Sequence, residues 1–123
     1  MSNLEIANCV DKLAYKKITA LTLREGRLSI KLSSGERLVI KGEHDPTIQW
    51  QTVDEPSKLK GGKLINVKVE LDCDDYEDDD EYWWNVYKVA VFTSKGSLFY
   101  DVKVDDGYEL QTHYLRKGER LCR

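Results

Sequence analysis

The chain is short of sulfur-containing residues, proline and long apolar runs. Its 123 residues include one Met, two Pro and three Cys. The cysteines Cys9, Cys73 and Cys122 are odd in number and far apart, which favours free thiols in a reducing cytoplasm over a disulfide framework. The first residues lack a basic start and an apolar stretch, and no apolar run approaches the roughly 18 residues of a membrane span. We therefore expect a cytoplasmic location, with no secretory signal and no membrane association.

Motifs for catalysis and cofactor binding are also missing. The segment Lys60 to Lys63 contains two glycines but lacks the spacing of a phosphate-binding loop, so we interpret it as a flexible connector. His44 and His113 are far apart and match no metal-ligand spacing. A pair of Cys122 with His113 stays open, although nothing in the chain points to it. We expect no catalytic residue, no metal and no cofactor, and predict that the chain is not an enzyme. A small enzyme with a pocket that the sequence does not reveal is the weakest alternative.

Apolar residues are spaced as in a helix at the start of the chain and alternate afterwards. Ser2 and Glu5 match a capping box, and the apolar residues that follow fall on one face, which predicts a helix from Ser2 to Ala14. Turn signals at Glu25-Gly26, Lys95-Gly96 and Asp105 to Gly107 separate the alternating segments. These segments predict strands over residues 18–24, 27–32, 37–41, 47–53, 64–71, 82–92, 98–104 and 108–115.

This pattern predicts a single α+β domain over residues 1–123. We expect the N-terminal helix to pack on a twisted, mostly antiparallel sheet of six or seven strands, with room to curl into a half-barrel. Strand–helix–strand units are missing, so the sequence argues against parallel nucleotide-binding folds.

The feature that folding explains least is an acidic run from Asp72 to Glu81. Eight of its ten residues are acids, and no base interrupts them. The whole chain has 22 acids and 19 bases, a net charge of -3, whereas the chain outside this run has 14 acids and 19 bases, a net charge of +5. Repulsion between carboxylates and low strand propensity predict that the run stays outside the sheet as a connection. Tyr82, Trp83 and Trp84 follow at once, and which tryptophan is buried stays open because the register of the strand is unknown.

Four interpretations of the acidic run compete. A calcium loop is disfavoured, because Glu77 stands where such a loop needs glycine and Trp83 where it needs glutamate, although weak binding of a divalent cation stays open. Catalysis by paired carboxylates needs one carboxylate in a desolvated setting, which an exposed run does not offer. A solvated loop that only aids solubility is the plainest alternative. The last interpretation is a surface that binds a basic protein, because clustered carboxylates steer a cationic partner and nearby aromatic side chains anchor it.

In general profile the chain resembles small bacterial immunity or antitoxin proteins, which are short, cytosolic, acidic and rich in β-sheet. This resemblance, with the acidic run, implies a non-enzymatic protein-binding module that inhibits a basic partner such as a nuclease-type toxin, whose cleft is built to hold phosphates. The expected partner-binding residues are Asp74, Asp75, Tyr76, Glu77, Asp78, Asp79, Asp80, Glu81 and Tyr82.

Two other interactions follow from the rest of the chain. Lysines cluster at Lys58, Lys60 and Lys63, and Trp50 offers a ring for base stacking, but the net negative charge argues against nucleic acid as the partner. The alternative function is an accessory or structural domain that associates with itself through a sheet edge, so a homodimer stays open.

Overall fold

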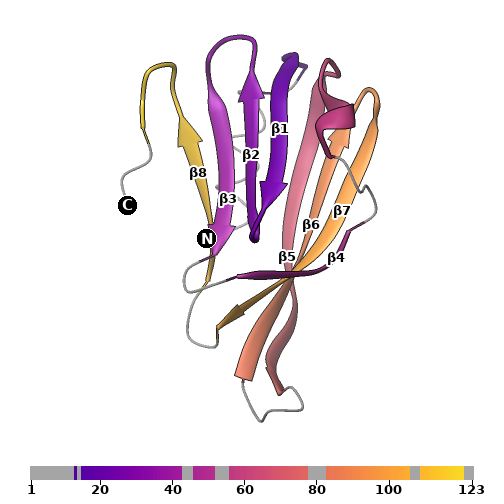
Figure 1. Cartoon of the computed structure of the whole chain (residues 1–123), viewed down its shortest axis with the longest axis vertical. Coiled ribbons are helices and arrows are strands. Elements are labelled where there is room, and N and C mark those ends of the chain that lie inside the picture. Colours follow the sequence, from indigo (N-terminus) through magenta and orange to yellow (C-terminus); the bar gives the residue numbers. More distant parts are fainter. Residues whose placement is uncertain are drawn as a thin grey trace.

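The part of the chain described by the computed structural model consists of residues 13, 15–42, 46–51, 56–77, 83–105 and 109–120, and for 49–51 and 73–77 the description covers the backbone. Within these residues eight β-strands form two four-stranded antiparallel sheets (Figure 1). The strands are β1 (Ile18–Arg24), β2 (Arg27–Leu32), β3 (Arg37–Gly42), β4 (Thr47–Gln51), β5 (Leu64–Glu77), β6 (Trp83–Thr93), β7 (Gly96–Asp105) and β8 (Leu110–Leu115).

Hydrogen bonding orders the first sheet β1-β2-β3-β8 and the second β4-β7-β6-β5. β1, β2 and β3 follow one another through tight turns, and so do β6 and β7. At the β1–β2 turn, Glu25 and Gly26 have φ values of 50° and 77°. Positive φ at both central residues is the geometry that matches the twist of a two-residue hairpin, so the turn predicted from Glu25-Gly26 is confirmed. A Cβ on Gly26 would lie 2.7 Å from the Cβ of Pro46, so this position also needs the small residue.

The two sheets are joined at two places. β3 pairs with β8 as far as Gly42 and Leu110, and the pairing of β4 with β7 begins shortly beyond, at Thr47 and Lys103, in nearly the same register. At the other side, Lys17 and Lys63 form an antiparallel bridge between the starts of β1 and β5. The order of hydrogen-bonded strands therefore returns on itself. β5 lies beside the first strand of the β1-β2-β3 meander after a long connection, which is a Greek-key arrangement.

Apolar side chains of both sheets form one buried cluster between them. On β2 and β3, Leu28, Ile30 and Ile40 are fully buried, and on β6 and β7 so are Val91 and Leu98. Leu59 joins the cluster from the 3₁₀ turn η1 (Pro56–Leu59). Burial alternates most clearly along β2 and β7, as the period of two along a strand requires, whereas Leu38, Val39 and Ile40 of β3 are all buried.

The predicted α+β class is wrong. The described residues form two antiparallel sheets, and they contain no helix of seven or more residues. The predicted helix Ser2–Ala14 lies outside the described residues except for Leu13, which is buried. The single sheet of six or seven strands is also wrong. Alternation of apolar and polar residues indicates only that one face of a strand is buried. Two sheets that face each other produce this pattern, and so does one sheet covered by a helix.

Candidate functional site

The first six residues of the acidic run are part of a strand. β5 continues through Asp72 to Glu77, and its pairing with β6 ends at Glu77 opposite Trp83. The prediction that the whole run stays outside the sheet is therefore wrong. Trp83 and Trp84 supply the physical reason, because aromatic residues favour the extended backbone and their strand offers a ladder of hydrogen bonds to the acidic segment.

Two bulges interrupt the ladder where the acids begin. The register shifts between Leu71 and Cys73 and again between Cys73 and Tyr76, each time with one extra residue on β5. Such insertions bend a strand, increase its twist and change the direction of its side chains. They allow consecutive acids to enter a strand without all joining one regular ladder. Figure 1 shows the ends of β5 and β6 reaching below the other labelled strands, and we call residues 71–84 the hairpin tip.

The expected partner-binding residues divide into two groups at this tip. Asp74, Asp75, Tyr76 and Glu77 lie in β5, where the description covers their backbone. Asp78, Asp79, Asp80, Glu81 and Tyr82 lie outside the described residues. In the sequence, the second group lies between Glu77 and Trp83. The proposed contact of these nine residues with a partner stays a prediction.

The tip also exposes apolar side chains. Trp83 is 47% exposed and Leu71 is 48% exposed, and the neighbouring Asp72 is exposed as well. Trp84 is half-buried, and the ammonium of Lys103 lies 4.5 Å from the centre of its ring. A cation over an aromatic face is attracted by the ring quadrupole. Sequence reasoning missed Lys103 and Leu71. Lys103 could be found only from the pairing of β6 with β7, which brings residues distant in sequence together.

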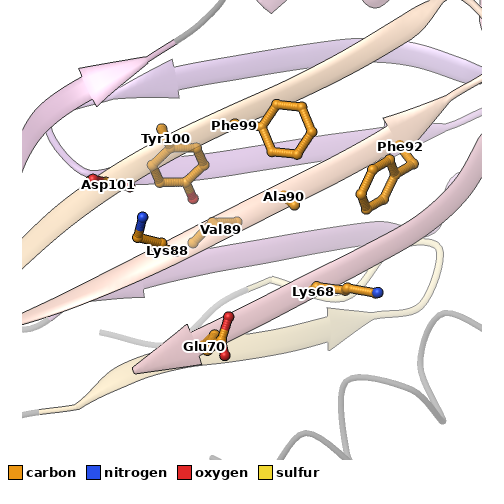
Figure 2. A pocket seen from close by; sticks show the side chains of 9 residues that line it. All are labelled: Lys68, Glu70, Lys88, Val89, Ala90, Phe92, Phe99, Tyr100 and Asp101. Atoms are coloured by element: carbon orange, nitrogen blue, oxygen red, sulfur yellow. The ribbon is translucent and has the colours of Figure 1, made fainter. Parts of the chain in front are cut away.

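A second candidate lies on the solvent-facing side of β5, β6 and β7. It is a hollow of about 390 Å³ lined by Lys68, Glu70, Lys88, Val89, Ala90, Phe92, Phe99, Tyr100 and Asp101 (Figure 2). Phe92 and Phe99 meet edge to face, with ring centres 5.6 Å apart and planes at 84°. Figure 2 shows Lys68 and Glu70 on one side of Ala90, and Phe99 and Asp101 on the strand at its other side.

The lining of this hollow combines aromatic, aliphatic and charged side chains. The nine residues that line it include no His, Cys or Ser, so it lacks the usual pairing of a nucleophile with a base. Tyr100 is fully buried, and burial raises the pKa of its hydroxyl above the ordinary value. A phenol in that setting stays protonated at neutral pH. Sequence reasoning missed the two Phe residues, which the two-residue turn between Thr93 and Gly96 brings together.

Elsewhere, one carboxylate is held strongly by its neighbours. Glu36 accepts hydrogen bonds from Lys16, Tyr114 and the hydroxyl of Ser34, the last at 2.7 Å. The bond from Lys16 is the main cause that lowers the pKa of Glu36 to about 2, and those from Tyr114 and Ser34 add to it. The bond to Glu36 in turn raises the pKa of Tyr114. A carboxylate so engaged connects three segments of the chain and is not available to a ligand.

The remaining chemical groups do not assemble into a reactive site in the described residues. Burial, with the charges of Lys41 and Arg27, lowers the pKa of His113, which favours the neutral ring. Its sequence-suggested partner Cys122 lies outside the described residues, as do Cys9 and His44. Among the residues described, no group of three or more His, Cys, Asp or Glu side chains is placed to hold a metal ion. In that part of the chain, no helix has the length and apolar character needed to cross a membrane.

Comparisons of the chain with family models, with curated proteins and with solved structures found no match.

Proposed function

We propose that the chain is a non-enzymatic protein-binding module whose hairpin tip engages a basic surface on a partner protein. The observation that carries this proposal is the position of the acidic run. It occupies the end of a paired two-stranded extension, beside exposed apolar side chains at Leu71 and Trp83. A solvated loop that served only solubility would not require the ordered strands that lead to it.

The chemistry of the tip suits a cationic protein in two ways. Clustered carboxylates raise the rate of encounter with a positive surface, and this effect weakens as salt screens the charges. Exposed aromatic and aliphatic side chains supply the desolvated contacts that give an interface most of its affinity. Leu71 precedes Asp72 in the chain, and Trp83 pairs with Glu77, so each exposed apolar side chain lies next to an acid of the run.

A partner with a deep positive cleft fits this surface best. Proteins that act on nucleic acids carry such clefts, because they neutralise several phosphates at once. The carboxylates of the acidic run would take the place of the phosphate backbone in such a cleft. We therefore favour an inhibitor of the immunity or antitoxin type, acting in the cytoplasm on a nuclease-type toxin.

The test compares two variants with the same net charge. The first carries Asp78→Asn, Asp79→Asn and Asp80→Asn at the tip. The control carries Glu25→Gln, Glu109→Gln and Glu119→Gln, three exposed acids outside residues 71–84. Each variant is used to capture proteins from a lysate at low and high salt, and the association rate of any captured protein is then measured.

The proposal expects a basic protein that wild type and control retain at low salt and release at high salt. Loss of three steering charges should slow its association with the tip variant by about tenfold or more, with melting temperatures unchanged. If the captured protein is a nuclease, wild type should inhibit it and the tip variant should inhibit it less. Equal capture by both variants, or capture that salt does not change, would show that the tip is not the binding surface.

A further inference from the structure

β5 is the edge strand of its sheet, and beyond its first residue its outer edge is unpaired within the part of the chain that the structure describes. Only its first residue is paired on that side, where the N–H of Tyr15 donates to the carbonyl of Leu64 at 2.6 Å and the N–H of Leu64 donates to the carbonyl of Lys16 at 3.0 Å. Beyond Leu64, no other strand of the described chain pairs with this edge. An open edge is a template for the addition of a further strand.

The pairing of β6 tells which backbone groups of β5 point outward. Thr93 and Gly96 flank a two-residue turn, and the residues that flank such a turn form a hydrogen-bonded pair. Because hydrogen-bonded pairs recur at every second residue, the odd-numbered residues of β6 direct their backbone N–H and C=O groups to β7. Even-numbered residues of β6 therefore bond to Asn66, Lys68 and Glu70 of β5.

The backbone groups of Val67, Val69 and Leu71 are then left at the open edge. The N–H of Val67 is consistent with this, since it donates to the side-chain oxygen of Asn66 at 2.9 Å. Bulges fall on both sides of this stretch, so residues 66–71 form one regular run.

We propose that two copies of this chain pair antiparallel through this run, with Val69 opposite the partner's Val69. This register places Lys68 opposite the partner's Glu70, and Glu70 opposite the partner's Lys68. Both are non-hydrogen-bonded positions, where opposed Cα atoms lie about 4.5 Å apart and side chains are closest. Lys68 and Glu70 are both exposed and form no ion pair within the described residues, so both are available to a second copy.

Charge selects this register over its neighbours. In the two neighbouring registers, the outward backbone groups of the two copies still face each other. One of these registers places Lys68 opposite the partner's Lys68, and the other places Glu70 opposite the partner's Glu70. Like charges directly opposite one another destabilise a sheet. A lysine on an edge strand normally prevents pairing with other chains. In the Val69-centred register, Lys68 instead lies opposite the partner's Glu70, which has the opposite charge.

The same register completes a row of charges across the solvent-facing side. Asp101, Lys88 and Glu70 are opposed across β7, β6 and β5, and the partner's Lys68 extends this row with the sign alternating at every step (Figure 2). On the opposite face, the exposed Leu71 comes to lie opposite the partner's Val67. The two hairpin tips point to opposite ends of such a dimer. This inference does not depend on the proposed function, although a dimer would present two separate tips.

The test uses two charge reversals that complement each other. Lys68→Glu makes both opposed pairs Glu–Glu, and Glu70→Lys makes both Lys–Lys. Sedimentation equilibrium should show that each variant alone forms a homodimer at least tenfold weaker than wild type, equivalent to about 1.4 kcal/mol. An equimolar mixture of the two variants restores two opposite-charge pairs, so it should form a heterodimer of about wild-type strength. The double variant Lys68→Glu with Glu70→Lys should likewise dimerise as wild type does.

The control is Lys31→Glu, an exposed lysine of β2 whose reversal changes the net charge by the same amount as Lys68→Glu. It should leave the dimer unchanged, and circular dichroism should show every variant folded. A wild type that stays monomeric at its highest soluble concentration overturns the proposal. So does a dimer that both single variants retain, because its interface would lie elsewhere. A mixture that forms no heterodimer overturns the register.

Discussion

The two ends of the molecule differ in how tightly the chain is held. At one end, which we call the closed end, the β2–β3 turn lies beside the starts of β1 and β5 (upper part of Figure 1). Backbone bonds join these segments, with the N–H of Ile18 donating to Gly62 at 2.7 Å, the N–H of Gly61 donating to Ile18 at 2.8 Å and the N–H of Ser33 donating to Lys17 at 2.9 Å. Glu36 adds its three side-chain bonds at the same end. The hairpin tip is at the opposite end, and there Leu71, Asp72 and Trp83 are exposed.

The difference suggests a division between stability and binding. Long-range bonds and buried side chains at the closed end close the ring of strands, and so carry much of the free energy of unfolding. The hairpin tip contributes little to that closure. Its residues can therefore be exchanged without loss of the fold, which is the condition under which a binding surface can change its specificity.

The strongest test of this contrast is a pair of leucines in the same strand. Leu64 at the closed end is fully buried, whereas Leu71 at the hairpin tip is 48% exposed. Leu64→Ala should lower the free energy of unfolding by about 2–5 kcal/mol, because it removes buried apolar surface and leaves a cavity. Leu71→Ala should change it by no more than about 0.5 kcal/mol under conditions where the protein is monomeric. Urea unfolding followed by fluorescence measures both, and equal losses would show that the tip is part of the cooperative core.

Much of the closed end could be predicted from sequence, because local rules determine it. The strands Ile18–Arg24 and Arg27–Leu32, whose outer ends reach the closed end, have the predicted bounds, since alternation and the Glu25-Gly26 turn at their other ends act over a few residues. The hydrogen bonds of Glu36 could not be predicted. Its donors Lys16 and Tyr114 are far from it in sequence, and only the pairing of β3 with β8 brings Tyr114 near.

The hairpin tip was harder to predict because two local preferences conflict there. Carboxylates disfavour a strand, and Trp83 and Trp84 favour one, so the outcome depends on their pairing. Which tryptophan is more buried depends on a register set by β7 and by two bulges, and it could not be read from β6 alone. Tertiary pairing therefore decided the features that make the tip a candidate site, while the list of acids was evident from the sequence.

The next prediction concerns the pH dependence of the closed end. Because the folded protein lowers the pKa of Glu36 to about 2, ionised Glu36 stabilises the fold above the unfolded pKa near 4.5, and this contribution is lost as pH falls from about 5 towards 2. Glu36→Gln should cost about 1 kcal/mol at neutral pH, because solvent screens the bonds of this carboxylate, and the cost should shrink over that acid interval. Thermal unfolding across this pH range tests it. Glu70→Gln is the control at an exposed carboxylate without an ion pair in the described residues, and under conditions where the protein is monomeric it should leave the curve near wild type.

The smallest expected change in stability concerns the cation–π pair of Lys103 and Trp84 at the hairpin tip. Lys103→Met keeps most of the side-chain length but removes the charge that lies 4.5 Å from the ring centre of Trp84. Exposed and partly exposed cation–π pairs contribute about 0.5–1 kcal/mol, so the free energy of unfolding should fall by that amount or less. Lys88→Met on the neighbouring strand is the control, since it removes the same charge from the same sheet. Trp fluorescence should change its emission in Lys103→Met and stay constant in Lys88→Met. If both variants lose the same stability and neither alters the emission, the base of the tip is held by backbone pairing alone, and the cation over Trp84 does not order it.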